Sequence, residues 1–210
     1  PNPDAIVLRS FKMHDMELPQ SLKAVARAGA GVNNIPIEKC TEKGIVVFNT
    51  PGANANGVKE LVIAGLLLAS RDITNAVAWG KTLVGKGDEV PALIEQGKKN
   101  FAGQEIEGKT LAVIGLGAIG VLVANAAQAL GMKVIGYDPY MKVKQALKLS
   151  NQVKWVDGIQ PLLAEADYVT INIPLTPETK GYINKEKFSM MKDNVRLLNF
   201  ARGGLVDISD

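Results

Sequence analysis

The 210-residue sequence has one cysteine, one histidine and no long apolar run. Cys40 has no second thiol for an internal disulfide and no Cys or His neighbour at the spacing of metal ligands, so a structural thiol is expected and a metal site is not. The longest apolar stretch, residues 61–69, is well short of the roughly 20 residues that cross a bilayer, and it predicts a buried helix. The composition therefore disfavours disulfide-stabilised, metal-dependent and membrane-spanning proteins.

Neither sign of charge is in large excess. The 24 Lys and Arg residues against 21 Asp and Glu residues give a formal charge of +3. No block of about five or six like charges occurs, so no nucleic-acid partner is expected. The first residues do not resemble a signal peptide, which makes the cytoplasm the expected compartment.

The sequence does contain a repeated alternation of short apolar runs and helix-like stretches, which is typical of parallel βα units. In the N-terminal part, apolar runs at residues 5–8, 22–26 and 45–48 alternate with a helix-like stretch at 37–43. A long helical pattern then runs from Gly57 to about Val84, and it is expected to cross between two domains.

A second alternation begins after Gly108. It predicts four strands and three helices, with strands at 110–114, 133–137, 168–173 and 195–200 and helices at 118–130, 161–165 and 184–191. Parallel strands joined by helices form a doubly wound sheet, so the predicted class is α/β with a Rossmann-type sheet and a second, smaller α/β domain.

A glycine motif lies at the start of this second alternation. Gly115, Gly117 and Gly120 have the spacing G-x-G-x-x-G, which alone is a weak signal because glycine is common. Here the motif follows an apolar strand and opens a helix. In that context Gly115 permits a tight turn, Gly117 lets backbone approach a pyrophosphate, and Gly120 lets the helix pack on the sheet.

The ligand predicted by this motif is NAD. The backbone N–H groups of Ala118 and Ile119, at the helix N-terminus, are expected to donate to phosphate oxygens. Asp138, which follows the next strand, is expected to accept hydrogen bonds from the adenosine ribose hydroxyls and to repel a 2′-phosphate. The alternative is a glycine turn of a doubly wound sheet that binds no dinucleotide.

Several separated segments together resemble the D-2-hydroxyacid dehydrogenase family. The segments that carry the resemblance are Arg27–Ile35, Val47–Pro51, Asn54 with Val58 and Glu60, Ile173–Thr176, and Asn199–Asp207. The resemblance implies a partial flavodoxin-like substrate domain over residues 1–53 and a truncated Rossmann NAD-binding domain over 54–210, so that both are incomplete. It also implies a homodimer or homotetramer.

The resemblance further implies site residues. Arg202 becomes the catalytic arginine, which binds the substrate carboxylate and polarises its carbonyl; a planar guanidinium matches a carboxylate with two hydrogen bonds. The alternative for both Arg202 and Arg9 is an arginine that is merely solvated at the surface. The resemblance places Arg9 near the substrate, where Lys12 would add charge toward a phosphate. By resemblance the substrate is bound by Arg9, Ser10, Ala30, Gly31, Val32 and Asn54. By resemblance the cofactor is also lined by Ile173, Pro174, Phe200, Ala201 and Arg202.

The sequence also departs from the family. The family's general acid is a histidine supported by a glutamate, and both come after the arginine segment, beyond Asp210. His14, the one histidine, matches no catalytic motif and is expected to be exposed. We therefore expect residues 1–210 alone to bind cofactor poorly and to show negligible turnover. Ala118 replaces a basic or polar residue that the family often has, which leaves backbone contact with the pyrophosphate at that position.

The activity implied is NAD-dependent oxidation of a small 2-hydroxy acid, most specifically of 3-phosphoglycerate to 3-phosphohydroxypyruvate in serine synthesis. One alternative is a reductase of hydroxypyruvate, glyoxylate or another 2-keto acid, distinguished by whether Arg9 and Lys12 face a phosphate. An alternative of another class is an NAD(H)-sensing protein similar to the family's corepressors, which would need a groove for a partner peptide.

Overall fold

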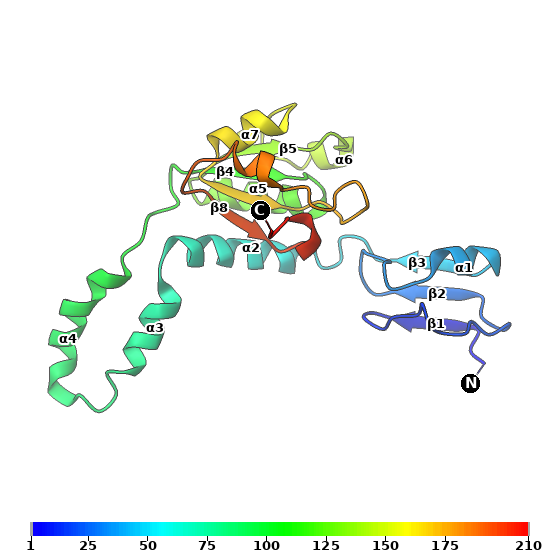
Figure 1. The fold of residues 1–210 in the computed structure, drawn as a ribbon, viewed down its shortest axis with the longest axis horizontal. Helices are drawn as coiled ribbons and strands as arrows, with labels where there is room; N and C mark the ends of the chain where they lie inside the picture. Colours follow the sequence, from blue (N-terminus) through cyan, green and yellow to red (C-terminus); the bar gives the residue numbers. More distant parts are fainter. Residues whose placement is uncertain (1, 210) are drawn as a thin grey trace. The chain divides into compact units, whose positions relative to one another are not determined.

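Two compact units, Pro1–Asn56 and Gly57–Asp210, make up the chain in the computed structural model, which describes residues 2–209. Each unit is built on its own all-parallel sheet with flanking helices (Figure 1). The predicted α/β class with parallel sheets is confirmed.

The first unit has a three-stranded sheet in the order β1-β2-β3, formed by β1 (Ala5–Leu8), β2 (Ala24–Arg27) and β3 (Val46–Asn49). Helix α1 (Ile37–Glu42) packs on one face through Cys40, which is fully buried with Val25. Burial raises the pKa of the Cys40 thiol, because the charged thiolate loses solvation. The expectation of a structural thiol is therefore confirmed.

The second unit has a five-stranded parallel sheet in the order β6-β5-β4-β7-β8. Its strands are β4 (Thr110–Ile114), β5 (Lys133–Tyr137), β6 (Lys154–Trp155), β7 (Tyr168–Ile171) and β8 (Arg196–Asn199). The predicted number of four strands was wrong, because the two residues of β6 are too short to produce an apolar pattern. β4 and β5 have the bounds that the sequence predicts.

Helices cover both faces of this sheet (Figure 1). Side chains alternate along a strand, so Leu111 and Val113 of β4 face one core while Ala112 and Ile114 face the other. The first core contains side chains of α2 (Ala55–Ser70) and α5 (Ala118–Ala129), and the second contains side chains of α7 (Ile159–Glu165). Three further short helices lie between or after these strands: α6 (Val143–Ala146), α8 (Lys185–Phe188) and η3 (Gly203–Leu205).

The prediction of one long helix from Gly57 to about Val84 was wrong, because the helix is interrupted after Ser70. α2 ends there, and α3 (Ile73–Lys81) starts at an angle of 70° to it. In a continuous helix the Ser70 carbonyl would accept the N–H four residues on, but here it accepts the Gln104 N–H at 3.1 Å. The last carbonyl of α2 is therefore satisfied by a contact distant in sequence.

The segment between Ser70 and Gln104, residues 71–103, is called the arm. It contains α3, η1 (Gly87–Glu89), α4 (Val90–Gly97) and η2 (Lys98–Phe101), and none of these four elements has a buried residue. The rings of Trp79 and Phe101 pack against each other with centroids 5.2 Å apart. Figure 1 shows α3 and α4 side by side, apart from the helices on the sheet.

Helix α2 is only partly buried, contrary to the buried helix predicted for residues 61–69. Val62 and Leu66 are fully buried, whereas Leu61, Leu67 and Leu68 are 56%, 40% and 47% exposed. Only one stripe of the helix faces the sheet. Within residues 2–209, no single helix has the length and apolar character to cross a membrane, and α2 with α3 reaches them only as a bent pair.

Candidate active site and cofactor site

The glycine motif forms the turn between β4 and α5. Gly115 has φ +87°, a left-handed conformation that favours glycine, and its N–H donates to the Tyr137 carbonyl at 2.8 Å. A Cβ on Gly115 would also lie 2.7 Å from the Ile173 side chain. The strand thus ends in a turn that only glycine fits.

The other two glycines of the motif differ in what surrounds them. A Cβ on Gly120 would lie 1.8 Å from the Gly115 carbonyl oxygen, so the first turn of α5 packs directly on the glycine turn. Nothing lies within 4 Å of a Cβ on Gly117. The protein itself fills the space at Gly120, whereas the space at Gly117 is open to a ligand.

The N-terminus of α5 suits an anion. Gly117 is the N-cap residue and no side chain caps the helix. Val121 N–H donates to the Gly117 carbonyl at 3.2 Å, so the N–H groups of Ala118 and Ile119 precede the hydrogen bonds within the helix. Free N–H groups and the positive end of the helix dipole favour phosphate there, and the residues present fit a pyrophosphate.

Asp138 directly follows β5, as the sequence predicts for the ribose-binding acid. Its two carboxylate oxygens accept backbone hydrogen bonds from Leu116 at 2.9 Å and from Tyr140 at 2.8 Å. The sequence reasoning missed the Leu116 bond, because it depends on the turn geometry. An ionised carboxylate has about four acceptor sites, so two backbone bonds leave room for ribose hydroxyls.

The remaining cofactor-site residues follow β7 and β8. Both strands run parallel to β4, so their carboxyl ends share one edge with the glycine turn. Ile173 and Pro174 follow β7, and the Phe200 ring would meet a Cβ on Gly65 of α2 at 2.7 Å. This edge brings together the predicted residues Gly115, Gly117, Ala118, Ile119, Gly120, Asp138, Ile173, Pro174, Phe200, Ala201 and Arg202.

Arg202 lies just past the carboxyl end of β8 and is exposed. Asn199 holds the backbone of this segment: its amide Nδ2 donates to the Arg202 carbonyl at 2.7 Å, and its Oδ1 accepts the Ala201 N–H at 3.1 Å. The Arg202 Nη1 donates to the Ala201 carbonyl at 2.8 Å. The other terminal nitrogen can therefore reach a ligand without breaking that bond.

In the first unit, the predicted substrate-binding residues follow the strand ends. Arg9 and Ser10 come after β1, Ala30, Gly31 and Val32 come after β2, and Asn54 precedes α2. The Asn49 amide Nδ2 donates to the Ala30 carbonyl at 2.7 Å, and Thr50 N–H donates to the Gly29 carbonyl at 3.1 Å. The loop after β2 is thus fixed by residues at the end of β3.

A buried asparagine links the first two strand ends, which the sequence reasoning did not single out. Asn34 is 6% exposed, and its Nδ2 donates to the carbonyls of Arg9 at 3.2 Å and Phe11 at 2.7 Å. Its Oδ1 accepts the Arg27 Nε at 2.9 Å. All three amide contacts position backbone or side chains of the candidate substrate loops.

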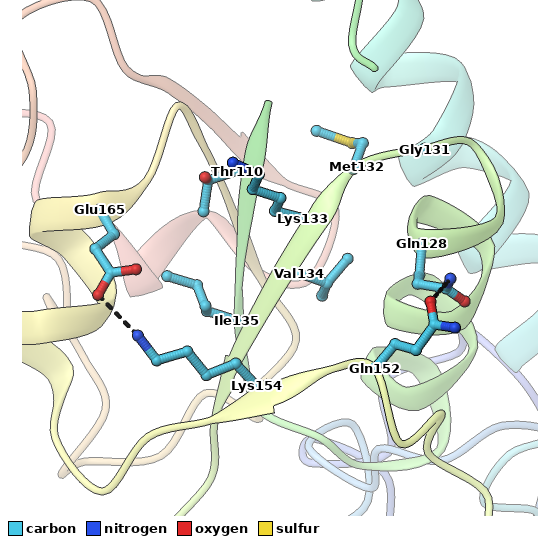
Figure 2. A pocket seen from close by; sticks show the side chains of 10 residues that line it. All are labelled: Thr110, Gln128, Gly131, Met132, Lys133, Val134, Ile135, Gln152, Lys154 and Glu165. Atoms are coloured by element: carbon cyan, nitrogen blue, oxygen red, sulfur yellow. Dashed lines mark hydrogen bonds and ion pairs between the residues drawn. The ribbon is translucent and has the colours of Figure 1, made fainter. Parts of the chain in front are cut away.

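Two cavities of the second unit lie at the other edge of the sheet. One of about 400 Å³ is lined by the first residues of β4 and β5, with the Lys154–Glu165 ion pair (3.0 Å) on one side and contacting Gln128 and Gln152 on the other (Figure 2). A second, of about 360 Å³, adjoins Asp167. Neither contains a residue of the glycine motif.

Asp167 has a structural role at that edge. Burial would raise its pKa, but the hydrogen bonds from Lys192 and the Thr110 N–H, together with the charges of Lys192 and Lys109, lower it overall. Among residues 2–209, no three His, Cys, Asp or Glu side chains are grouped as metal ligands.

The parallel sheet, the glycine turn, the free helix N-terminus and the following aspartate define a dinucleotide-binding Rossmann domain. Residues 64–210 match the profile of the D-isomer specific 2-hydroxyacid dehydrogenase NAD binding domain. The chain therefore belongs to the D-isomer specific 2-hydroxyacid dehydrogenase family, and NAD is its cofactor.

Relatives agree with this assignment. The chain is 42% identical over 207 residues to D-3-phosphoglycerate dehydrogenase of Methanocaldococcus jannaschii, covering 97% of this chain and 37% of that protein. It is 41% identical to hydroxypyruvate reductase of Thermotoga maritima, covering 99% of this chain and 63% of that protein. The chain thus spans less than two thirds of these relatives.

Solved structures agree as well. NAD-bound 3-phosphoglycerate dehydrogenase of Entamoeba histolytica superposes with a TM-score of 0.74 at 31% identity, covering 98% of this chain and 58% of that one. D-lactate dehydrogenase of Aquifex aeolicus, complexed with NAD and lactic acid, has a TM-score of 0.74 at 29% identity, covering 97% and 58%.

Proposed function

We propose that the protein oxidises 3-phosphoglycerate to 3-phosphohydroxypyruvate with NAD. The observation that carries the proposal is the position of Arg202, an exposed guanidinium at the same sheet edge as the glycine turn. The phosphorylated substrate is supported by the 42% identity to a protein named D-3-phosphoglycerate dehydrogenase. Bound NAD supplies the acceptor for the hydride that leaves C2 of the hydroxy acid.

In the second unit we assign the carboxylate of the substrate to Arg202. A planar guanidinium can bind a carboxylate with two hydrogen bonds and draw electron density from the adjacent carbonyl oxygen. Asn199 keeps the backbone beneath it fixed through two hydrogen bonds. Ile173 and Pro174 are assigned to the adenine side of the cofactor, and Phe200 and Ala201 to the nicotinamide side.

In the first unit we assign substrate binding to two loops. The backbone N–H groups of Ala30, Gly31 and Val32 bind a carboxylate, and Arg9 with Ser10 binds the phosphate, with Lys12 adding charge. Arg9, Ser10 and Lys12 are exposed, as contact with a ligand requires. Asn54, also exposed, is assigned to the substrate.

The second candidate is a reductase of hydroxypyruvate or another 2-keto acid. The relative named hydroxypyruvate reductase favours it, because its identity of 41% is nearly equal and this chain covers 63% of its length. The two candidates share the fold, the cofactor and Arg202, and they differ in whether a phosphate is bound.

The deciding measurement is NADH consumption by the full-length protein, with 3-phosphohydroxypyruvate and hydroxypyruvate offered in parallel. The proposal predicts a strong preference for the phosphorylated ketone. Preference for hydroxypyruvate would transfer the assignment to a general 2-keto acid reductase. NADH binding without turnover of either ketone would favour an NAD(H)-sensing protein.

Arg202→Lys tests the assigned role directly. A lysine keeps the charge but loses the two parallel hydrogen bonds, so kcat/KM is expected to fall by about 100-fold, the effect of removing one transition-state donor. The matched control is Arg196→Lys, whose guanidinium lies over the Tyr168 ring at the opposite edge and is expected to leave kcat/KM nearly unchanged. Equal losses in both variants would contradict the assignment.

We also propose that a second copy of the chain covers the arm and the outer stripe of α2. None of the arm helices has a buried residue, and Val77 and Ile94 are 55% and 42% exposed. Helices with so little buried surface are only marginally stable by themselves, because most helical stability comes from packing. In a twofold dimer the same patch of each subunit packs against its copy. Light scattering should show a dimer or tetramer, and Val77→Asp should shift it toward monomer; a monomeric wild-type protein would refute the proposal.

A further inference from the structure

The Asp138 side chain is bound to the glycine turn. Its carboxylate accepts the Leu116 N–H at 2.9 Å, and Leu116 is the residue between the first two glycines of the motif. The second carboxylate oxygen accepts the Tyr140 N–H at 2.8 Å. One side chain thus joins the turn after β4 to the turn after β5.

Leu116 is held from its other side as well. Its side chain is fully buried, and a Cβ on Gly136 of β5 would lie 2.9 Å from its Cδ1, so Gly136 provides the space for it. The preceding residue, Gly115, donates its N–H to the Tyr137 carbonyl at 2.8 Å. The glycine turn is therefore fixed to β5 by two backbone donors and one buried side chain.

This arrangement divides the N–H groups of the turn between two tasks. The Leu116 N–H is directed to Asp138 and is not available to a phosphate. The N–H groups of Ala118 and Ile119 come before the first helical hydrogen bond of α5, which Val121 makes at 3.2 Å. Their direction depends on how the preceding turn is held.

We propose that Asp138 is a positioning residue for the pyrophosphate loop, in addition to the ribose acceptor that the motif predicts. By fixing Leu116, its carboxylate holds the turn in the conformation that presents Ala118 and Ile119 to the anion. This inference rests on the cofactor site proposed above, and it extends the role of Asp138 from the adenosine half of NAD to the phosphates.

The two roles of Asp138 predict different losses in Asp138→Ala. If the carboxylate served the ribose alone, only ligands with an adenosine ribose would bind more weakly. If it positions the loop, inorganic pyrophosphate, which has no ribose, also binds more weakly. Loss of a hydrogen bond to a charged group corresponds to a loss of affinity of about tenfold or more.

The first measurement is amide hydrogen exchange of Leu116 in the ligand-free full-length protein, followed by NMR or mass spectrometry. We expect exchange to accelerate by about tenfold or more in Asp138→Ala. The second is pyrophosphate titration monitored at the Ala118 and Ile119 amides, with NADH affinity measured in parallel. Asp193→Asn, an exposed carboxylate before β8 at the opposite edge, is the matched control and should change neither.

The conservative variant Asp138→Asn keeps the proposal testable if Asp138→Ala does not fold. It keeps the size of the side chain but presents an NH₂ donor toward one of the two N–H groups, so a smaller loss in the same direction is expected. Unchanged Leu116 exchange, or a loss of NADH affinity with pyrophosphate affinity intact, would overturn the proposal. A protein that binds NADH but reduces no 2-keto acid would refute the proposed reaction while leaving this inference standing, because the exchange measurement needs neither cofactor nor substrate.

Discussion

Two glycines of the same motif should respond differently when each is replaced by alanine: one replacement lowers stability and the other leaves it nearly unchanged. Gly120→Ala places a Cβ 1.8 Å from the Gly115 carbonyl oxygen, whereas Gly117→Ala places one where nothing lies within 4 Å. Gly117 also has φ −73°, which alanine adopts without strain. The first change therefore acts on the protein and the second on the space reserved for a ligand.

The cost of Gly120→Ala follows from that distance. A carbon and a carbonyl oxygen approach to about 3.3 Å, so α5 and the glycine turn must separate by about 1.5 Å. Both contact atoms belong to structure that cannot rotate away, which favours the upper part of the overpacking range of about 1–3 kcal/mol. The better helix propensity of alanine returns less than about 1 kcal/mol, leaving a net loss of about 2 kcal/mol in the free energy of unfolding.

Thermal unfolding followed by circular dichroism measures this loss. A change of about 2 kcal/mol in a chain of this size lowers Tm by about 4–8 °C. Gly117→Ala should stay within about 0.5 kcal/mol of wild type, as an unhindered surface substitution does.

Cofactor binding, followed by NADH fluorescence, should separate the variants further. Gly117→Ala is expected to weaken NADH binding, because its Cβ occupies the space through which the pyrophosphate approaches the backbone. The expected loss of affinity is about tenfold or more, which is the effect of losing one hydrogen bond to a charged group. Gly120→Ala should weaken binding as well, since it displaces the first turn of α5. The reasoning is refuted if Gly117→Ala lowers Tm as much as Gly120→Ala, or if it leaves NADH affinity unchanged.

Three further predictions concern the support of the sheet. Gly103→Ala would place a Cβ 2.0 Å from the Ser70 carbonyl, so the free energy of unfolding should fall by about 2 kcal/mol in chemical denaturation. Tyr168→Phe removes the hydroxyl that lies 2.6 Å from the Ser70 Oγ and should cost about 1 kcal/mol in the same assay; an unchanged midpoint would contradict the bond. Asp167→Asn should cost about 1 kcal/mol at pH 7. Because the folded-state pKa of Asp167 is lowered, that stabilisation is present above its unfolded pKa of about 3.9 and lost as pH falls through the folded pKa, so wild type and variant should converge in acid.

The sequence predicted those parts of the fold that depend on local pattern. β4 and β5 have the expected bounds because each is a short apolar run that ends at a glycine turn or an aspartate. The glycine motif and Asp138 were predicted as a cofactor site because residue type and spacing together specify the turn, and the NAD-binding family is confirmed.

The features that the sequence did not predict depend on contacts between distant residues. The carbonyl of Ser70, at the end of α2, accepts the Gln104 N–H, and nothing in the residues around Ser70 signals that partner. The bond from Leu116 to Asp138 depends on how two turns approach each other, which spacing does not determine. Asn34 joins two loops in the same way, and its side chain looks like that of any polar loop residue until the fold is known.

Because the arm is closed at its base, its residues could be replaced by a segment of another length or sequence. The Gln104 N–H donates to the Ser70 carbonyl, so residues 71–103 leave the sheet layers and return to them at one point. The register of β4 comes from its pairing with β5 and β7, so it does not depend on what lies within residues 71–103. Doubling the length of a flexible loop costs only about 0.6 kcal/mol in closure entropy, so this base would accept a segment of another length, or a foreign sequence, while the cofactor-binding sheet folds as before.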